Sequence, residues 1–196
     1  MAEHREVAPP FRAPAGQIEV KAEPLGLVRA LIRRIDVLND WVGRAMSWLA
    51  LLLVVVTTYD VVSRYLFRKS FVFIQELEWH LFAVLFLVAA GYTHLKGDHV
   101  RVDIFYARMS PRNRAWIDLV LGVLFLFPTC FLLIWTSIPF VVASVKVLEG
   151  SPDPGGIPGR FLLKAVIPLG FILIALQGFS ETIKDLFRVL GKEVPK

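Results

Sequence analysis

Residues 119–145 read LVLGVLFLFPTCFLLIWTSIPFVVASV, a run of 27 residues without a single Asp, Glu, Lys or Arg. A helix needs about 20 predominantly apolar residues to cross the roughly 30 Å of hydrocarbon in a bilayer. A soluble core in a chain of 196 residues requires no uninterrupted apolar run of this length. The run therefore predicts a transmembrane helix, and Pro128 and Pro139 within it predict a kink or a tilt.

Three shorter charge-free runs occupy residues 45–59, 79–95 and 165–180. Each reaches the length of a membrane span if the charged side chains at its ends extend outward to the headgroups. The sequence therefore predicts an all-α integral membrane protein with four transmembrane helices, which form one membrane domain over residues 25–190. The predicted spans cover about residues 45–66, 77–95, 115–145 and 161–183.

The overall composition agrees with a membrane protein. Hydrophobic residues make up 56% of the chain and charged residues 20%, whereas a typical soluble domain carries about 25% charged residues. The net charge of +5 fits basic loops that face the cytoplasm and anionic lipid, so we expect no nucleic-acid partner. The single cysteine, Cys130, cannot form an intramolecular disulfide and is expected to be a packing residue.

The distribution of basic residues predicts the orientation. Sixteen of the 22 Lys and Arg residues precede span one, separate spans two and three, or follow span four, and six lie on the opposite side. The positive-inside rule then places both termini in the cytoplasm. Residues 1–24, rich in Ala, Glu and Pro, are predicted to be a disordered cytoplasmic tail, and residues 191–196 a second cytoplasmic tail.

Two stretches outside the spans have helical periodicity. One covers residues 25–40, where apolar and charged side chains occupy different faces, and it predicts an amphipathic helix in the inner interface. The alternative, a cytoplasmic extension of span one, stays equally open. The other runs from Val102 to Met109 and predicts a second interfacial helix between spans two and three. Ser110 and Pro111 then supply an N-cap and a first-turn proline for span three.

The centres of the four spans lack the chemistry of a transport pathway. They fall near Val55, Phe86, Thr129 and Ile172, and no charged residue lies within about four positions of any of them. A transporter that carries its own substrate usually places ionisable groups near the midplane. A small multidrug antiporter is therefore disfavoured.

Asp60 is the most deeply placed charge, and Arg64 follows it one helical turn later. The leading interpretation is an internal ion pair that stabilises packing. A proton or ion relay and a contact with a partner subunit remain as alternatives.

Catalysis and cofactor binding have no candidate residues. A haem with two axial histidines needs them on two facing helices, but His80, His94 and His99 all belong to span two or its inner end, and His4 lies in the tail. The sequence contains no phosphate-binding, dinucleotide or zinc motif. We therefore expect neither an enzyme nor a bound cofactor or metal.

Three patches together resemble a known family, the small membrane subunit (Q or DctQ type) of tripartite ATP-independent periplasmic (TRAP) transporters. The likeness covers about residues 27–190. The patches are Arg64–Phe67 with Gln75–Glu78, then Gly91 with Gly97–Asp103, and finally Glu149 and Ser151 with Arg160–Ala165.

The resemblance implies a division of labour in a bacterial inner membrane. A soluble periplasmic binding protein (P type) captures a small organic anion, and a large membrane subunit (M type) moves it by ion-coupled transport. The small subunit would scaffold the large one, which fits span centres without charges. The rival interpretation is a stand-alone protein with four spans, either an assembly factor or a small channel.

The candidate contact residues lie at the ends of the spans. We predict that Arg64 and Glu76 form a polar contact that holds spans one and two together at the outer side. The alternative is that each side chain simply extends to the lipid headgroups. Lys164 has two candidate partners, Glu149 and a lipid phosphate, of which we rank the lipid first. The full set of predicted packing or partner-contact residues is Asp60, Arg64, Glu76, Gly91, His99, Arg101, Asp103, Glu149 and Lys164. Of these, His99, Arg101 and Asp103 are expected to organise the inner loop.

Overall fold

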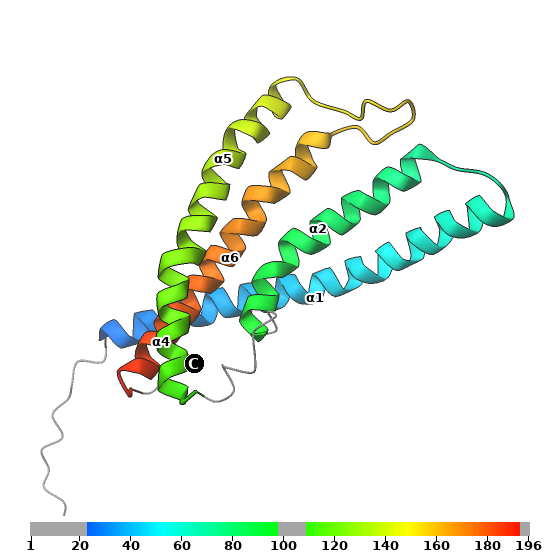
Figure 1. The fold of residues 1–196 in the computed structure, drawn as a ribbon. Helices are drawn as coiled ribbons and strands as arrows, with labels where there is room; N and C mark the ends of the chain where they lie inside the picture. The colour runs from blue at the N-terminus through cyan, green and yellow to red at the C-terminus, as the bar shows by residue number, and fades with distance from the viewer. Residues whose placement is uncertain (1–22, 98–108, 193–196) are drawn as a thin grey trace, which may run out of the picture.

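The computed structural model describes residues 23–97 and 109–192, and all regular structure within these ranges is helical (Figure 1). The elements are α1 (Glu23–Leu66), α2 (Val72–Lys96), α4 (Pro111–Leu121), the π-helical segment η1 (Gly122–Leu126), α5 (Phe127–Lys146) and α6 (Arg160–Val189).

Within residues 23–97 and 109–192, four helices are long and apolar enough to cross a membrane, which confirms the prediction of four spans. They are α1, α2, the continuous helix formed by α4, η1 and α5, and α6. The helices extend beyond the predicted spans, above all at the start of α1, which is 44 residues long. Residues 25–40 form the first turns of α1 and continue into span one without a break. The predicted tail 1–24 and the amphipathic stretch 102–109 fall almost entirely outside the described residues.

Local sequence explains where several helices begin and end. Gly97 has φ 71°, a left-handed conformation that glycine adopts without strain, and it caps the end of α2. The hydroxyl of Ser110 accepts a hydrogen bond from the backbone N–H of Asn113, and Pro111 occupies the first turn of α4. The predicted N-cap of span three is thereby confirmed.

The expected distortion at Pro128 takes the form of a π-helical turn. Proline has no N–H to donate, and its ring clashes with the carbonyl four residues earlier, here that of Leu124. In η1 the N–H of Phe127 donates to the carbonyl of Gly122, five residues back. This wider turn accommodates the proline while the helix continues into α5.

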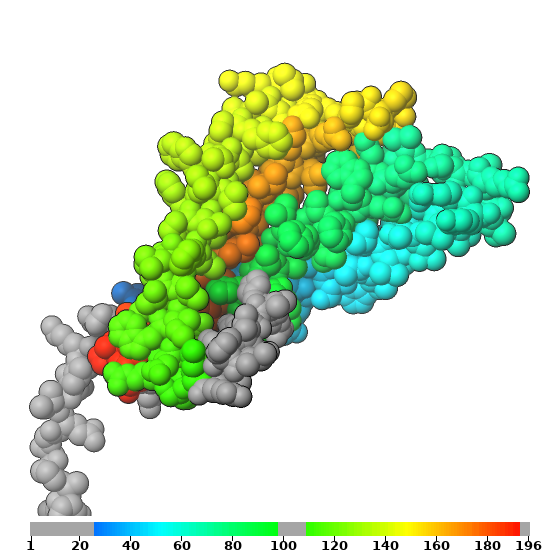
Figure 2. Space-filling model, viewed as in Figure 1, coloured from blue at the N-terminus to red at the C-terminus, as the bar shows by residue number. Residues whose placement is uncertain are grey.

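The last helix of the chain is the central one. α6 packs against α1, α2, α4, η1 and α5. α5 lies on one side of it and α2 on the other, and α6 is recessed between them in the space-filling view (Figure 2). At Gly170 the main chain of α6 passes close to α2, since a Cβ atom there would lie 2.6 Å from the carbonyl oxygen of Leu87.

The bundle has two distinct ends. The start of α1, the end of α2, the start of α4 and the end of α6 gather at one, which we call the terminal end (Figure 1). The connections 67–71 and 147–159 lie at the other, which we call the hairpin end. At the terminal end the first turns of α1 pass across the last turns of α6.

Candidate functional site

A buried polar network joins α1 to α6 at the terminal end. It consists of Asp36, Asn39, Gln177, Ser180, Glu181 and Lys184, which we call the α1–α6 cluster. The carboxylate of Asp36 accepts from the Gln177 amide at 2.9 Å and from the Ser180 hydroxyl at 2.7 Å. Its other oxygen accepts from Lys184 Nζ at 2.7 Å, and Lys184 also donates to Glu181 at 2.7 Å.

The interior of this cluster is closed to solvent. Asn39, Gln177 and Ser180 are each 0% exposed, and the Asn39 amide nitrogen donates to the Gln177 side-chain oxygen at 2.9 Å. Removing one member of such a network destabilises the protein by more than one hydrogen bond contributes to stability. The reason is that the partners left behind stay buried without a hydrogen bond. The cluster therefore holds the start of α1 firmly on α6.

Gly91 on α2 lies next to the cluster, where there is no room for a side chain. A Cβ atom at this position would collide with the side-chain oxygen of Asn39. The missing side chain at position 91 therefore leaves room for the Asn39 amide where α1, α2 and α6 meet. The structure thus places the predicted residue Gly91 in helix packing within the chain.

A second set of ion pairs ties α1 to the end of α2. The carboxylate of Asp40 accepts from Arg44 Nε at 2.7 Å and from Lys96 Nζ at 2.9 Å. Lys96 also lies over the ring of Tyr92, 5.1 Å from its centre. These contacts are more exposed than the α1–α6 cluster, and surface pairs of this kind contribute little individually.

At the hairpin end, Asp60 and Arg64 form the ion pair that their spacing predicts. The guanidinium of Arg64 donates to the Asp60 carboxylate one turn earlier on α1. Asp60 is buried while Arg64 is largely exposed. The arginine therefore neutralises a charge within the helix pair and extends its own head to the surface.

Glu76 forms hydrogen bonds with the loop 147–159 and not with Arg64. The predicted polar contact between Arg64 and Glu76 is therefore wrong. Its carboxylate accepts from the Ser151 hydroxyl and from the Ile157 backbone N–H. Among the described residues no ion pair joins Glu76 to Arg64. The physical reason is that Arg64 already has a carboxylate one turn away, whereas Glu76, in the first turns of α2, faces the loop between α5 and α6.

The loop is anchored a second time through Glu149. Its carboxylate accepts from the Ser144 hydroxyl at 2.6 Å, on α5, and from Lys164 Nζ, on α6. The hydrogen bonds from Lys164 and Ser144 hold the pKa of Glu149 below its usual value. Lys164 also lies 4.1 Å from the centre of the Phe140 ring. Lys164 thus pairs with the protein partner that the sequence analysis ranked second, behind lipid phosphate.

Sequence reasoning missed the α1–α6 cluster. Gln177 and Ser180 lie inside the predicted fourth span, and a polar side chain in an apolar helix was the available signal. Their partners on α1 lie 138 to 144 positions earlier in the chain, so the pairing itself had no local signature. His99, Arg101 and Asp103 fall outside the described residues.

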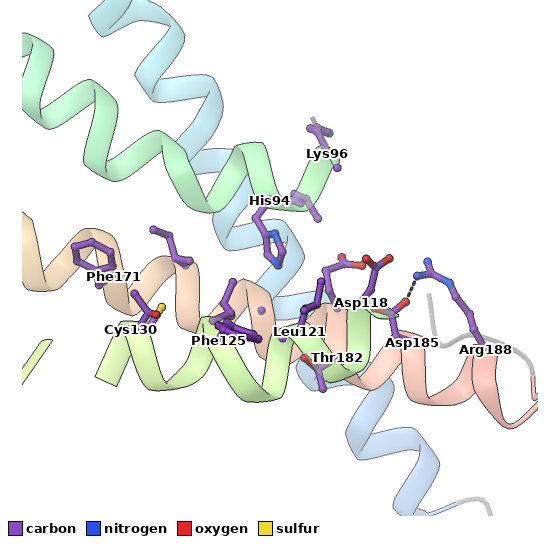
Figure 3. A pocket seen from close by; sticks show the side chains of 18 residues that line it. His94, Lys96, Asp118, Leu121, Phe125, Cys130, Phe171, Thr182, Asp185 and Arg188 are labelled. Carbon is purple, nitrogen blue, oxygen red and sulfur yellow. Dashed lines mark hydrogen bonds and ion pairs between the residues drawn. The ribbon is translucent and has the colours of Figure 1, made fainter. Parts of the chain in front are cut away.

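A cavity of about 680 Å³ opens at the terminal end between α2, α4–η1 and α6 (Figure 3). Leu121, Phe125 and Phe171 provide apolar walls, while Asp185 and Arg188 form an ion pair at the polar side. Among the described residues no group of three or more His, Cys, Asp or Glu side chains could hold a metal ion. The cavity therefore has both apolar walls and ionisable side chains in its lining.

The comparisons with known proteins agree on one family. Residues 53–188 match the DctQ component of tripartite ATP-independent periplasmic transporters. The chain belongs to the DctQ family. It is also 25% identical over 163 residues to the ectoine TRAP transporter small permease protein TeaB of Halomonas elongata, an alignment that covers 83% of this chain and 79% of TeaB. This DctQ protein is thus a TRAP small permease with four helices of membrane-spanning length.

Proposed function

We propose that this DctQ protein is a non-catalytic brace for a large TRAP membrane subunit. In this proposal the large subunit performs ion-coupled uptake of a small organic anion, delivered by a periplasmic binding protein. The chain would lie in a bacterial inner membrane with the terminal end in the cytoplasm and the hairpin end in the periplasm.

The observation that carries the proposal is the placement of the polar groups. Both ends of the bundle contain internally paired charges, whereas the span centres carry none. Ion pairs and hydrogen bonds between helices resist relative movement of those helices. Such a bundle suits a rigid support, and its span centres carry no charged residue that could bind a substrate at the midplane.

Wide apolar faces support a partner in the membrane. Long stretches of α1 and α5 expose large apolar side chains, among them Leu52, Val55, Phe131 and Trp135. Within a bilayer these faces can contact either lipid or another membrane subunit. The family membership favours the large TRAP subunit as one of these contacts.

Deleting the gene tests the proposal. We expect uptake to be lost while the periplasmic binding protein keeps its affinity for substrate. Co-purification of an affinity-tagged chain should recover a much larger membrane protein. Normal uptake by the large subunit and binding protein without this chain would refute the brace, and ion conductance by the purified chain alone would favour a channel.

A further inference from the structure

The first turns of α1 present three different faces. We define residues 26–44 of α1 as the arm. One face is buried: Ile32 is 0% exposed and Ile35 6% exposed, and next to them Asn39 joins the α1–α6 cluster. This face attaches the arm to the end of α6.

The second face is charged, and its acidic residues are already neutralised. Asp36 pairs with Lys184, and Asp40 pairs with Lys96 and Arg44. The arm also carries Arg29, Arg33 and Arg34, which are exposed and form no ion pair with any described residue. With respect to the described residues, the arm therefore has three uncompensated positive charges within six positions.

The third face is apolar and exposed. Leu27, Leu31, Leu38 and Trp41 recur at spacings of four, seven and three residues, which places them along one side of the helix. Leu27 is 75% exposed and Trp41 68% exposed. This side points away from Ile32 and hence away from α6.

We propose that the arm is a lipid-surface site selective for anionic phospholipids. An amphipathic helix that lies at a membrane surface inserts Trp and Leu at the boundary of headgroups and acyl chains and places Lys or Arg beside them. Each basic side chain near an anionic surface is attracted by its positive charge. Arg34 lies within the apolar face, and its long side chain can reach the headgroups from there.

Charge complementarity favours lipid over a protein helix as the occupant. A partner helix packed on this face would have to desolvate Arg34 or supply a carboxylate opposite it. An anionic leaflet supplies counter-charges along the whole arm without a fixed register. The proposal depends on the arm alone and not on any transport role.

The first test uses the full-length chain with equimolar palmitoyl-oleoyl phosphatidylglycerol and phosphatidylcholine, with bound lipid read by native mass spectrometry. Each arginine near an anionic surface contributes about fivefold in affinity. We therefore expect R33Q/R34Q to lower the preference for phosphatidylglycerol by roughly tenfold or more, whereas R33K/R34K keeps it. An unchanged preference in R33Q/R34Q would overturn the proposal.

A matched control removes two unpaired cations elsewhere at the terminal end. Arg112 and Lys192 are exposed and form no ion pair with a described residue. R112Q/K192Q should keep the wild-type lipid preference. An equal loss in this variant would show a general charge effect and would also overturn the site.

The second test detects the apolar face directly. A variant that keeps Trp41 and replaces the other four tryptophans by Phe is placed in nanodiscs that contain lipids with brominated acyl chains. We expect strong quenching of Trp41 fluorescence. Absence of quenching, or protection of Trp41 by the co-reconstituted large subunit, would show that the face is not covered by lipid.

Discussion

Individual side chains at the hairpin end have specific partners within the chain. Glu76 binds Ser151 and the main chain of Ile157, and Glu149 binds Ser144 and Lys164. Each carboxylate therefore links a helix to the loop 147–159. The loop is held at two points, so its conformation depends on both.

Glu76 and Ser151 should behave as one unit. E76Q and S151A should each lower the unfolding temperature, and the double variant should lose no more than the worse single variant, because either change already breaks the contact. Thermal unfolding of the purified protein in detergent measures this. As the control, the losses in unfolding temperature caused by R64Q and E76Q should add in the double variant. Coupling between Arg64 and Glu76, without coupling between Glu76 and Ser151, would contradict the structure.

Glu149 should make stability depend on acidity in a defined direction. Its pKa in the folded chain lies below the ordinary value of 4.5, so its contribution is complete above that value and is lost as pH falls through the lower folded value. We expect wild type to be more stable than E149Q at neutral pH and to lose this advantage below about pH 4.5. Denaturant unfolding between pH 7 and pH 3 measures the difference. In a K164M background, the stability difference between Glu149 and E149Q at neutral pH should be smaller. If the stability advantage of wild type over E149Q grew as the pH fell, the prediction would be wrong.

At the scale of elements, α6 holds the bundle together through close main-chain contact. Gly170 lets its backbone approach Leu87 on α2, and the polar side chains near its end bind α1. The helix thus combines tight apolar packing in its middle with hydrogen bonding at one end.

Adding one methyl group at position 170 should separate α2 from α6. The new Cβ would lie 2.6 Å from a main-chain oxygen, which cannot move aside like a flexible side chain. G170A should destabilise the protein by about 1–3 kcal/mol, the usual cost of overpacking. Equilibrium unfolding in detergent measures this change. G26A is the matched control, since nothing lies within 4 Å of a Cβ there, and equal effects from both variants would refute the close contact.

The number of helices could be predicted from sequence, whereas their neighbours could not. Hydropathy depends only on local composition, so residues 119–145 predict a span wherever they pack. The helix over residues 25–40 was predictable from its local periodicity, but the attachment of its first turns to α6 involves Asp36 and Lys184, which lie 148 positions apart. The pair Asp60 and Arg64 was predictable because one helical turn separates them, but Glu76 binds residues 75 and 81 positions away.

The whole molecule has a basic terminal end and a loop-bearing hairpin end. Arg29, Arg33 and Arg34 lie at the first, while the loop 147–159 closes the second. The positive-inside rule then gives one orientation for the entire bundle.

Cysteine labelling in intact cells tests that orientation. Cys130 is buried, and a C130A background removes it. We expect a membrane-impermeant maleimide to label D153C from outside and to label K192C only after the membrane is opened. Both side chains are exposed, so access depends on the side of the membrane. The reverse pattern would refute the proposed topology.

The central position of α6 also determines when this protein can fold during its synthesis. Of the described helices α6 is the last to leave the ribosome, so α1, α2 and α5 are made before the helix that joins them exists. Until then Asp36 and Asn39 lack Lys184 and Gln177, their partners in the finished bundle. A stop codon before position 177 therefore leaves a chain that retains three spans but exposes unpaired polar groups. Such a truncated chain should be less stable than the whole bundle, because these polar groups have lost their hydrogen-bond partners.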